Sequence, residues 1–404
     1  MRAYISLLIL ALALLPVPGA AQSLNTLYGF GGGAAGANPS AGVILGTGGA
    51  LFGTTPYGGA HGYGSVYQLT PPSGSGWQPS VIYGFKGAPD GANPGAALTL
   101  GSGGVFYGTT FGGGVSGNGT VFQLTPPSGA GAWTETVLYS FNGGSDGSGP
   151  LGTLYLDSTG ILYGTTFGGG AGAAGTVFTL TPPAGGVGSW SEAVIYSFTG
   201  ARGGSGPESG VIKVKKAFYG TTCCGTEGGT VYVLRQSNGV WARHPVYAFL
   251  DKANGSHPFG GLAADANGVL YGTTVEGGAS GTGTVFSLTP PATVGNLYTL
   301  TTIHSFTNGV DGGAPYGSTL LGPNGVLFVT ATVGCNSGVG GVLQFTPPAG
   351  GAGTWTEAIL HSFTGGSDGS QPFAGVVADG SNNLYGTTVF GGASQYGTVF
   401  ELTP

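Results

Sequence analysis

A short motif ending in Gly-Thr-Thr recurs along almost the whole chain at nearly constant spacing. Six copies have Phe or Tyr before it, and a degenerate seventh copy contains Phe-Val-Thr-Ala-Thr. The copies begin at residues 52, 107, 163, 219, 271, 328 and 385, so successive starts lie 52 to 57 residues apart. A fixed period of this kind is typical of proteins in which one small structural unit is stacked repeatedly. The apolar residues of one copy are therefore expected to be buried against the next copy.

Each repeat contains four short apolar pieces, which turn residues separate. In the third copy these pieces span residues 151–156, 161–166, 175–180 and 193–198, and we call them pieces A, B, C and D. A four-residue turn joins A to B, and a Thr-Pro-Pro segment that ends near a Trp joins C to D. Glycine-rich loops join B to C, and D to the next A. Short apolar runs between Gly and Pro clusters predict β-strands.

The composition excludes several other classes of protein. Of the 404 residues, 89 are Gly and 25 are Pro, while 40% are hydrophobic and 6% are charged. Helical bundles are disfavoured because each helical Gly costs about 1 kcal/mol, and disorder would require low hydrophobicity and high charge. The net charge of −6, with nine Lys and Arg residues, lacks the cationic surface that nucleic-acid binding needs.

Four strands in each of seven repeats predict a seven-bladed β-propeller of four-stranded antiparallel blades over residues 22–404. A β-solenoid is the alternative, although its coils usually have about 20–45 residues. The chain begins with a lone D-like piece at residues 26–30 and ends with A, B and C pieces between residues 373 and 402. We expect the N-terminal strand to complete the last blade, because this pairing would close the ring and remove the open edge that otherwise invites aggregation.

The first 21 residues have the pattern of an export signal. Arg2 precedes an apolar run at residues 5–15, and small residues lead to Ala21. This run is shorter than the roughly 20 residues that a transmembrane helix needs. We therefore expect cleavage after Ala21, an extracellular or periplasmic location, no membrane span in the mature chain, and a monomer.

The repeat as a whole resembles a known family. Its pattern is Tyr-Gly-Thr-Thr-x-x-Gly-Gly, then Gly-Thr-Val-Phe-x-Leu-Thr-Pro, then Trp-x-Glu-x-x-Leu-Tyr-Ser-Phe. This pattern resembles the GloVer tandem-repeat proteins, exported bacterial proteins whose name includes "choice of anchor". The resemblance covers residues 26–404, with departures at Cys223-Cys224 and at residues 328–335. It implies a β-propeller-like fold and export, and it carries no implication of an enzymatic activity.

Carboxylates recur at equivalent places in the D–A loops, at Asp90, Asp146, Asp311 and Asp368. Such recurrence favours capping of turns, and the alternative is a polar ring at one mouth of the pore. No zinc spacing, nucleophile elbow or phosphate loop occurs in the sequence. We therefore assign no catalytic residue, no metal and no cofactor. A non-catalytic binding or scaffold module is expected, and the alternative is a secreted hydrolase or lyase that acts on a polysaccharide.

Aromatic residues follow the Gly-Thr-Thr motif in four copies, at Tyr57, Phe111, Phe167 and Phe390. The B–C and D–A loops of a propeller emerge on the same side. Exposed aromatic rings there could stack on a glycan while the loop Asp residues accept hydrogen bonds from its hydroxyls. The alternative interpretation is that these rings fill the space between blades.

Positive charge is concentrated in the fourth repeat. Seven of the nine basic residues lie there, namely Arg202, Lys213, Lys215, Lys216, Arg235, Arg243 and Lys252. A local positive patch on an acidic protein predicts a docking surface for an acidic glycan or an extracellular protein. The alternative is sequence drift with solvated charges. Cys223 and Cys224, in the same repeat, could form a vicinal disulfide or a cross-link to a partner; Cys335 leaves the cysteine count odd.

Overall fold

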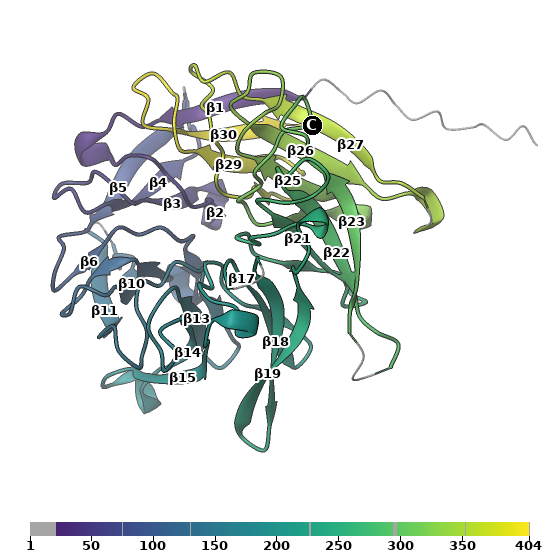
Figure 1. The fold of residues 1–404 in the computed structure, drawn as a ribbon. Coiled ribbons are helices and arrows are strands. Elements are labelled where there is room, and N and C mark those ends of the chain that lie inside the picture. Colours follow the sequence, from purple (N-terminus) through teal and green to yellow (C-terminus); the bar gives the residue numbers. More distant parts are fainter. Residues whose placement is uncertain are drawn as a thin grey trace, which may run out of the picture.

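The computed structural model describes residues 22–74, 76–129, 131–225, 228–293, 297–351 and 353–403. The predicted export signal at residues 1–21 lies outside these ranges. Within them, seven four-stranded antiparallel sheets are arranged as blades around a central axis (Figure 1). The helices of the described residues are 3-10 turns of three residues each. The structure thus confirms the predicted seven-bladed β-propeller.

The blades share one order, from an inner strand of two or three residues to a long outer strand. Blades 1 to 3 consist of β2 (Ile44–Leu45), β3 (Leu51–Thr55), β4 (Ser65–Thr70) and β5 (Gln78–Gly84); β7 (Thr99–Leu100), β8 (Phe106–Thr110), β10 (Thr120–Thr125) and β11 (Thr134–Ser140); and β12 (Tyr155–Leu156), β13 (Leu162–Thr166), β14 (Thr176–Thr181) and β15 (Ser191–Ser197). A separate pair, β6 (Gly91–Ala92) and β9 (Gly112–Gly113), joins two loops of blade 2.

The remaining four blades follow the same plan. They consist of β16 (Ile212–Val214), β17 (Ala217–Thr222), β18 (Thr230–Ser237) and β19 (Val240–Ala248); β20 (Ala263–Ala264), β21 (Leu270–Thr274), β22 (Thr284–Thr289) and β23 (Thr299–Ser305); β24 (Leu320–Leu321), β25 (Leu327–Ala331), β26 (Gly341–Thr346) and β27 (Thr356–Ser362); and β28 (Val377–Ala378), β29 (Leu384–Thr388), β30 (Thr398–Thr403) and β1 (Ser23–Gly29).

The two ends of the chain close the ring, as predicted. Strand β1 pairs antiparallel with β30, from Ser23 opposite Thr403 to Gly29 opposite Thr398. It begins three residues earlier than the predicted strand at residues 26–30. Beyond this pairing, Leu27 and Phe30 are buried in a cluster with Val43 and Leu51 of blade 1. The N-terminal segment therefore joins blade 7 to blade 1.

The Gly-Thr-Thr motif has a structural role in each blade, which blade 3 illustrates. Gly164 lies opposite Phe178 on β14, and the Phe178 ring occupies the space where a side chain on Gly164 would lie. The Thr165 hydroxyl donates a hydrogen bond to the Ser209 carbonyl of blade 4 (3.0 Å). The Thr166 and Thr176 hydroxyls are 2.8 Å apart and connect β13 to β14. The motif therefore stabilises both the blade itself and its contact with the next blade.

The same threonine link between blades occurs at six of the seven junctions. The donors equivalent to Thr165 are Thr54, Thr221, Thr273, Thr330 and Thr387, and each donates to a carbonyl in the following blade. Apolar clusters also lie between blades, as expected from the repeat. Val121 and Phe141 of blade 2, for example, pack with Leu162 and Phe178 of blade 3.

The predicted A piece at residues 151–156 is wrong in extent, because only Tyr155 and Leu156 pair with β13. The preceding residues form the wall of the central channel, where neighbouring blades converge. A Cβ on Gly152 would lie only 2.6 Å from the Gly210 amide nitrogen of blade 4. These residues therefore contact the adjacent blade instead of extending their own sheet.

Candidate binding site at the channel mouth

The seven A pieces surround a central cavity of about 550 Å³. The glycine-rich D–A and B–C loops lie together at one end of the blades, as isolated pairs such as Ser370–Phe390 and Ser148–Gly168 show. Each D–A loop ends in a proline, and the residue after that proline is the first residue of the channel wall. These seven wall residues define the mouth of the channel on the glycine-rich face.

The residues of this mouth differ from blade to blade, although the motifs around them recur. From blade 1 to blade 7 they are Ser40, Gly95, Leu151, Glu208, Phe259, Tyr316 and Phe373. One part of the mouth therefore carries a carboxylate followed by three aromatic rings. The part formed by blades 1 and 2 carries only a hydroxymethyl group and a hydrogen atom. The mouth is thus asymmetric in a ring whose blades are otherwise alike.

The aromatic side chains of the mouth form a continuous run across blades 5 to 7. The rings of Tyr316 and Phe373 are stacked with centroids 4.8 Å apart, and Phe259 lies 5.3 Å from Tyr316. The imidazole of His257 continues the run, 6.4 Å from Phe259 and nearly parallel to it. All four rings are half-buried. They present a wall that is anchored by packing and still reachable from solvent.

Two carboxylates accompany this wall. Burial raises the pKa of Glu208 to about 7, so a substantial fraction of this side chain is protonated near neutral pH. Burial and the nearby charges of Glu276 and Glu208 raise the pKa of the Tyr316 hydroxyl. Glu276 Oε2 also lies 3.3 Å from His257 Nδ1. The mouth therefore combines ring faces with hydrogen-bonding groups, as ligand sites commonly do.

The four aromatics predicted as a binding ring are exposed, with between 40% and 57% of each residue accessible. The four do not share one equivalent position in the B–C loop, because two of them lie one residue earlier in the loop than the other two. Tyr57 and Phe390 pair with the D–A loops of blades 1 and 7, whereas Phe111 and Phe167 precede the paired residue in blades 2 and 3. The Phe111 and Phe167 rings lie against Gly149 and Gly206 of the following loops, so these two also fill space between blades.

The four loop aspartates turn toward their own loops. Asp146 accepts hydrogen bonds from the Tyr139 hydroxyl (3.0 Å) and the Asn142 amide (2.8 Å). Asp311 is bonded to Thr307 and lies 3.1 Å from His304 Nε2. Although burial opposes it, these hydrogen bonds hold the pKa of Asp311 below its usual value. Asp90 and Asp368 are bound in the same way. This geometry favours the turn-capping interpretation.

The basic side chains of blade 4 that the structure describes do not form one surface. Lys215, Lys216 and Arg235 line a pocket beside blade 5, whereas Lys213 lies over the rings of Tyr155 and Phe218 of blades 3 and 4. The half-buried Arg243 donates to the Thr230 hydroxyl. Lys252 lies in a D–A loop, at the opposite end of the blade from the 215–216 turn. The side chain of Arg202 lies outside the described part of the structure.

The cysteines of blade 4 are joined to each other. Cys223 and Cys224 form a disulfide at the start of the B–C loop, and Cys335 is a buried free thiol in blade 6. Cys223 occupies the position that Phe111 and Phe167 have in blades 2 and 3. The vicinal disulfide therefore takes the place of an aromatic ring on the glycine-rich face.

A second group of carboxylates lies between the outer strands of neighbouring blades. Glu135 of β11 is close to Tyr83 and Asp90, and Glu192 of β15 is close to Asp146. One oxygen of each Glu is buried and has no hydrogen-bond partner among the described residues. Burial, and then the charge of the neighbouring aspartate, raises the pKa of each of these two Glu side chains to about 7.

These raised pKa values predict that stability falls as the pH rises from about 5 to 8. The folded state binds protons at Glu135 and Glu192 that the unfolded chain releases near pH 4.5, so their stabilising effect is lost as the pH passes 7. Urea unfolding at several pH values should show this decline, and the double substitution Glu135→Gln, Glu192→Gln should flatten it. The part of the decline that remains comes from Glu208 and Glu357, whose pKa values burial also raises. An equally steep decline in the double variant would contradict the assignment.

The mouth residues Glu208, Phe259, Tyr316 and Phe373 were not predicted as a site from the sequence. Their signal is the variation at the position after each D–A proline, which alignment of the seven A pieces makes visible. In the described part of the chain, no helix is long and apolar enough to cross a membrane. Nor do the described residues include a group of three or more His, Cys, Asp or Glu side chains placed to hold a metal ion.

Comparison with known proteins identifies a repeat family and the fold. A model described as the Gloeobacter/Verrucomicrobia repeat matches three overlapping segments, residues 16–227, 131–302 and 225–404. No curated protein matches the chain in sequence. A protein from Lactobacillus plantarum is similar in structure, with a TM-score of 0.50 and 15% identity over 80% of this chain and 84% of that protein. For a protein from Bacteroides uniformis, provisionally described as a 6-phosphogluconolactonase, the TM-score is 0.49 and the sequence identity is 15%, over 80% of this chain and 85% of that protein. At 15% identity, the likeness to the Lactobacillus plantarum protein shows the fold alone.

Proposed function

The chain belongs to the Gloeobacter/Verrucomicrobia repeat family, and we propose that it is a non-catalytic module that binds a carbohydrate at the mouth of its channel. The observation that carries this proposal is the asymmetric mouth, where Glu208 adjoins the aromatic run of Phe259, Tyr316 and Phe373. This is a place where the repeats depart from one another in chemistry while keeping the same backbone. Scaffold residues are expected to recur from blade to blade, whereas the residues that contact one asymmetric ligand need not recur.

The mouth has the chemistry that a sugar requires. A sugar ring has hydroxyl groups around its edge and apolar C–H faces, and these faces can pack on aromatic side chains. Near neutral pH, the Glu208 carboxyl is divided between an acceptor-only form and a form that also donates. The small side chains of Ser40 and Gly95, in blades 1 and 2, leave space in the mouth. A sugar unit can enter through this space and pack on the aromatic wall of blades 5 to 7. We therefore favour an uncharged sugar at the end or in a bend of a glycan.

A second candidate function is glycoside cleavage, because a carboxyl with a pKa of about 7 can act as a general acid. Most glycosidases pair such an acid with a second carboxylate roughly 5 to 10 Å away. Glu276, whose charge also acts on Tyr316, is the partner that the mouth offers. Release of reducing ends from a bound glycan, abolished by Glu208→Gln, would favour this enzyme over the binding module.

The binding proposal predicts that the purified chain binds members of a panel of neutral oligosaccharides in calorimetric titration. Tyr316→Ala should weaken that binding by at least about tenfold, since stacked aromatic contacts and their buried area are lost. Tyr57→Ala is the matched control, because it removes an exposed ring from the rim of the same face. Equal affinity in wild type and Tyr316→Ala, with both proteins folded by circular dichroism, would refute the proposed site.

We further propose that the protein is exported and acts as a monomer outside the cytoplasm. The signal-like pattern of residues 1–21 supports export, and a ring in which each of the seven blades has its four strands suits a monomer. Fractionation of the producing cells tests the first point, and light scattering of the purified chain tests the second. Protein that stays in the cytoplasm at full length would contradict export.

A further inference from the structure

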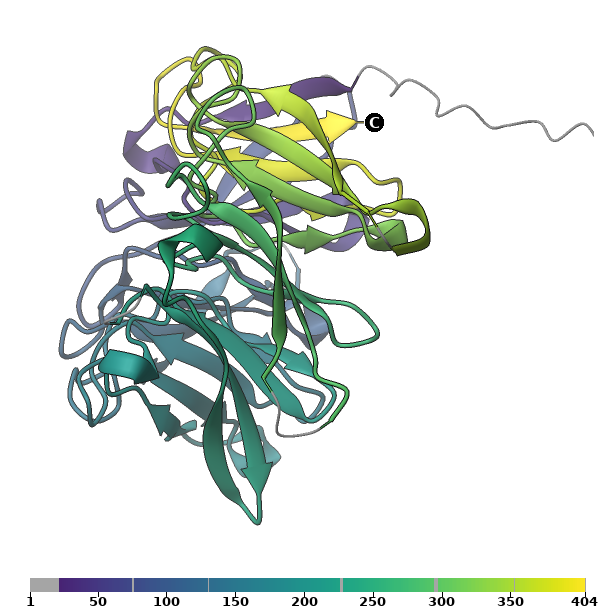
Figure 2. The same cartoon turned by 45° about the vertical axis from the view of Figure 1, so that its right-hand side comes forward.

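Blade 4 differs from the other blades at the end opposite the glycine-rich loops. Its inner strands β16 and β17 are joined by Lys215 and Lys216 alone, because Val214 pairs directly with Ala217. Lys215 adopts a positive φ of 56°, a conformation that usually favours Gly or Asn. Its outer hairpin lacks the Thr-Pro-Pro segment, and β18 and β19 extend to a tight turn that projects from the ring (Figures 1 and 2). At this end, blade 4 therefore has a shorter A–B turn and a longer outer hairpin, and we call this part of it the modified end.

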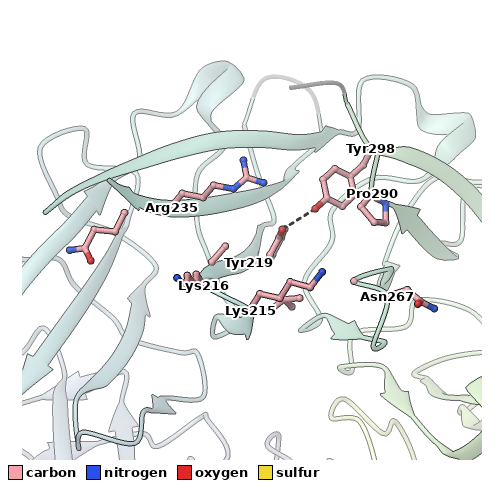
Figure 3. Close-up of a pocket in the computed structure, with 11 residues that line it drawn as sticks. Lys215, Lys216, Tyr219, Arg235, Asn267, Pro290 and Tyr298 are labelled. Atoms are coloured by element: carbon pink, nitrogen blue, oxygen red, sulfur yellow. Dashed lines mark hydrogen bonds between the residues drawn. The ribbon is translucent and has the colours of Figure 1, made fainter. Parts of the chain in front are cut away.

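The modified end of blade 4 forms one wall of a pocket of about 300 Å³ between blades 4 and 5. Lys215, Lys216 and Arg235 come from blade 4, whereas Asn267, Pro290 and Tyr298 come from blade 5. The Tyr219 and Tyr298 hydroxyls meet across the junction at 2.9 Å. Figure 3 shows the Arg235 guanidinium and the Lys215 side chain on either side of this tyrosine pair. Cationic and neutral donors thus surround one small volume.

The positive charge of the pocket is not neutralised within the described structure. No Asp or Glu lines the pocket, and Lys215, Lys216 and Arg235 form no ion pair with a described residue. Asp265, two residues before the lining residue Asn267, accepts hydrogen bonds from the Asn267 and Val269 amides of its own turn. In a chain of net charge −6, an uncompensated cationic pocket of this kind focuses the electrostatic field on an anion.

We propose that this pocket binds a single oxyanion group (a carboxylate, sulfate or phosphate) carried on a sugar. The planar guanidinium of Arg235 can form two hydrogen bonds with such a group, and the Lys215 ammonium can approach it from the other side. The Tyr298 ring and Pro290 supply apolar surface for the sugar itself. The site is separate from the channel mouth, because A–B turns and D–A loops lie at opposite ends of the blades, and the inference does not depend on the proposed function.

The test uses four probes built on one sugar: galacturonic acid, galactose 6-sulfate, galactose 6-phosphate and neutral galactose. Calorimetric titration at low salt should show binding of at least one anionic probe, at least about tenfold tighter than that of galactose and weakened by added salt. The double substitution Lys215→Gln, Arg235→Gln should raise its dissociation constant at least about tenfold. The anion that binds most tightly identifies which oxyanion the pocket prefers.

The matched control is the double substitution Lys213→Gln, Lys252→Gln, which removes the same charge from exposed positions of blade 4 outside the pocket. Compared with wild type at about 0.15 M salt, it should leave the affinity within about twofold, since charges farther apart than the Debye length of about 8 Å are largely screened there. Three results would overturn the proposal: no anionic probe binds more tightly than galactose, the pocket variant binds as well as wild type, or both double variants weaken binding equally. Unchanged melting temperatures would show that all variants remain folded.

Discussion

A chain that lacks residues 22–31 is expected to lose its closed ring and either aggregate or unfold at much lower temperature. The deletion removes β1, and the edge of β30 then exposes unpaired backbone groups over Thr398–Thr403. It also removes Leu27 and Phe30 from the cluster that joins blades 7 and 1. Loss of a buried Phe alone costs about 3–5 kcal/mol, so the deletion should be among the most destabilising changes in the molecule.

Light scattering and thermal melting of the deletion variant measure this effect. A synthetic peptide of residues 22–31 provides the control, because it should bind the open edge and restore part of the melting temperature. A deletion variant that remains monomeric and melts like wild type would show that β1 does not hold the ring closed.

The second large effect is expected for Gly164→Val, which places a side chain where the Phe178 ring and Leu154 now lie. Overpacking of this kind costs about 1–3 kcal/mol or more. Blade 6 accommodates a valine at the same position, since Val329 lies opposite Leu343 instead of a Phe. Thr319 of blade 6 occupies the position that Leu154 has in blade 3. Thr319, Val329 and Leu343 therefore form a set of residues whose sizes fit one another.

Transfer of this set to blade 3 tests the interpretation. The triple variant Leu154→Thr, Gly164→Val, Phe178→Leu should be more stable in urea unfolding than the sum of the three single changes predicts, because contacting residues are coupled. Single substitutions whose costs simply add would contradict a shared packing unit.

Much of the fold could be predicted because its determinants are periodic. The Gly-Thr-Thr spacing predicted seven blades, and the D-like residues near Tyr28 predicted which strand would close the ring. The extent of piece A could not be predicted, because it depends on how near Gly152 lies to Gly210 of the next blade. Convergence toward an axis is a property of the assembled ring, and no local pattern encodes it.

The candidate sites were harder to predict for a related reason. Lys213 and Lys215 are two residues apart, yet one lies over blade 3 and the other faces blade 5, so a count of charges could not separate them. Phe259 and Tyr316 are 57 residues apart in sequence and become neighbours only through the ring. A sequence comparison of blades can show that the mouth position varies, whereas only the structure shows that its aromatic members are stacked.

A structure of the ring bound to the oligosaccharide of highest affinity would test the channel-mouth site most directly. We predict a sugar ring packed against Tyr316 within the run from Phe259 to Phe373, with a hydroxyl group hydrogen-bonded to the carboxyl of Glu208. A sugar bound instead beside Tyr57 and Phe390 on the rim, or only in the pocket of Lys215 and Arg235, with no density at the channel mouth, would contradict the account.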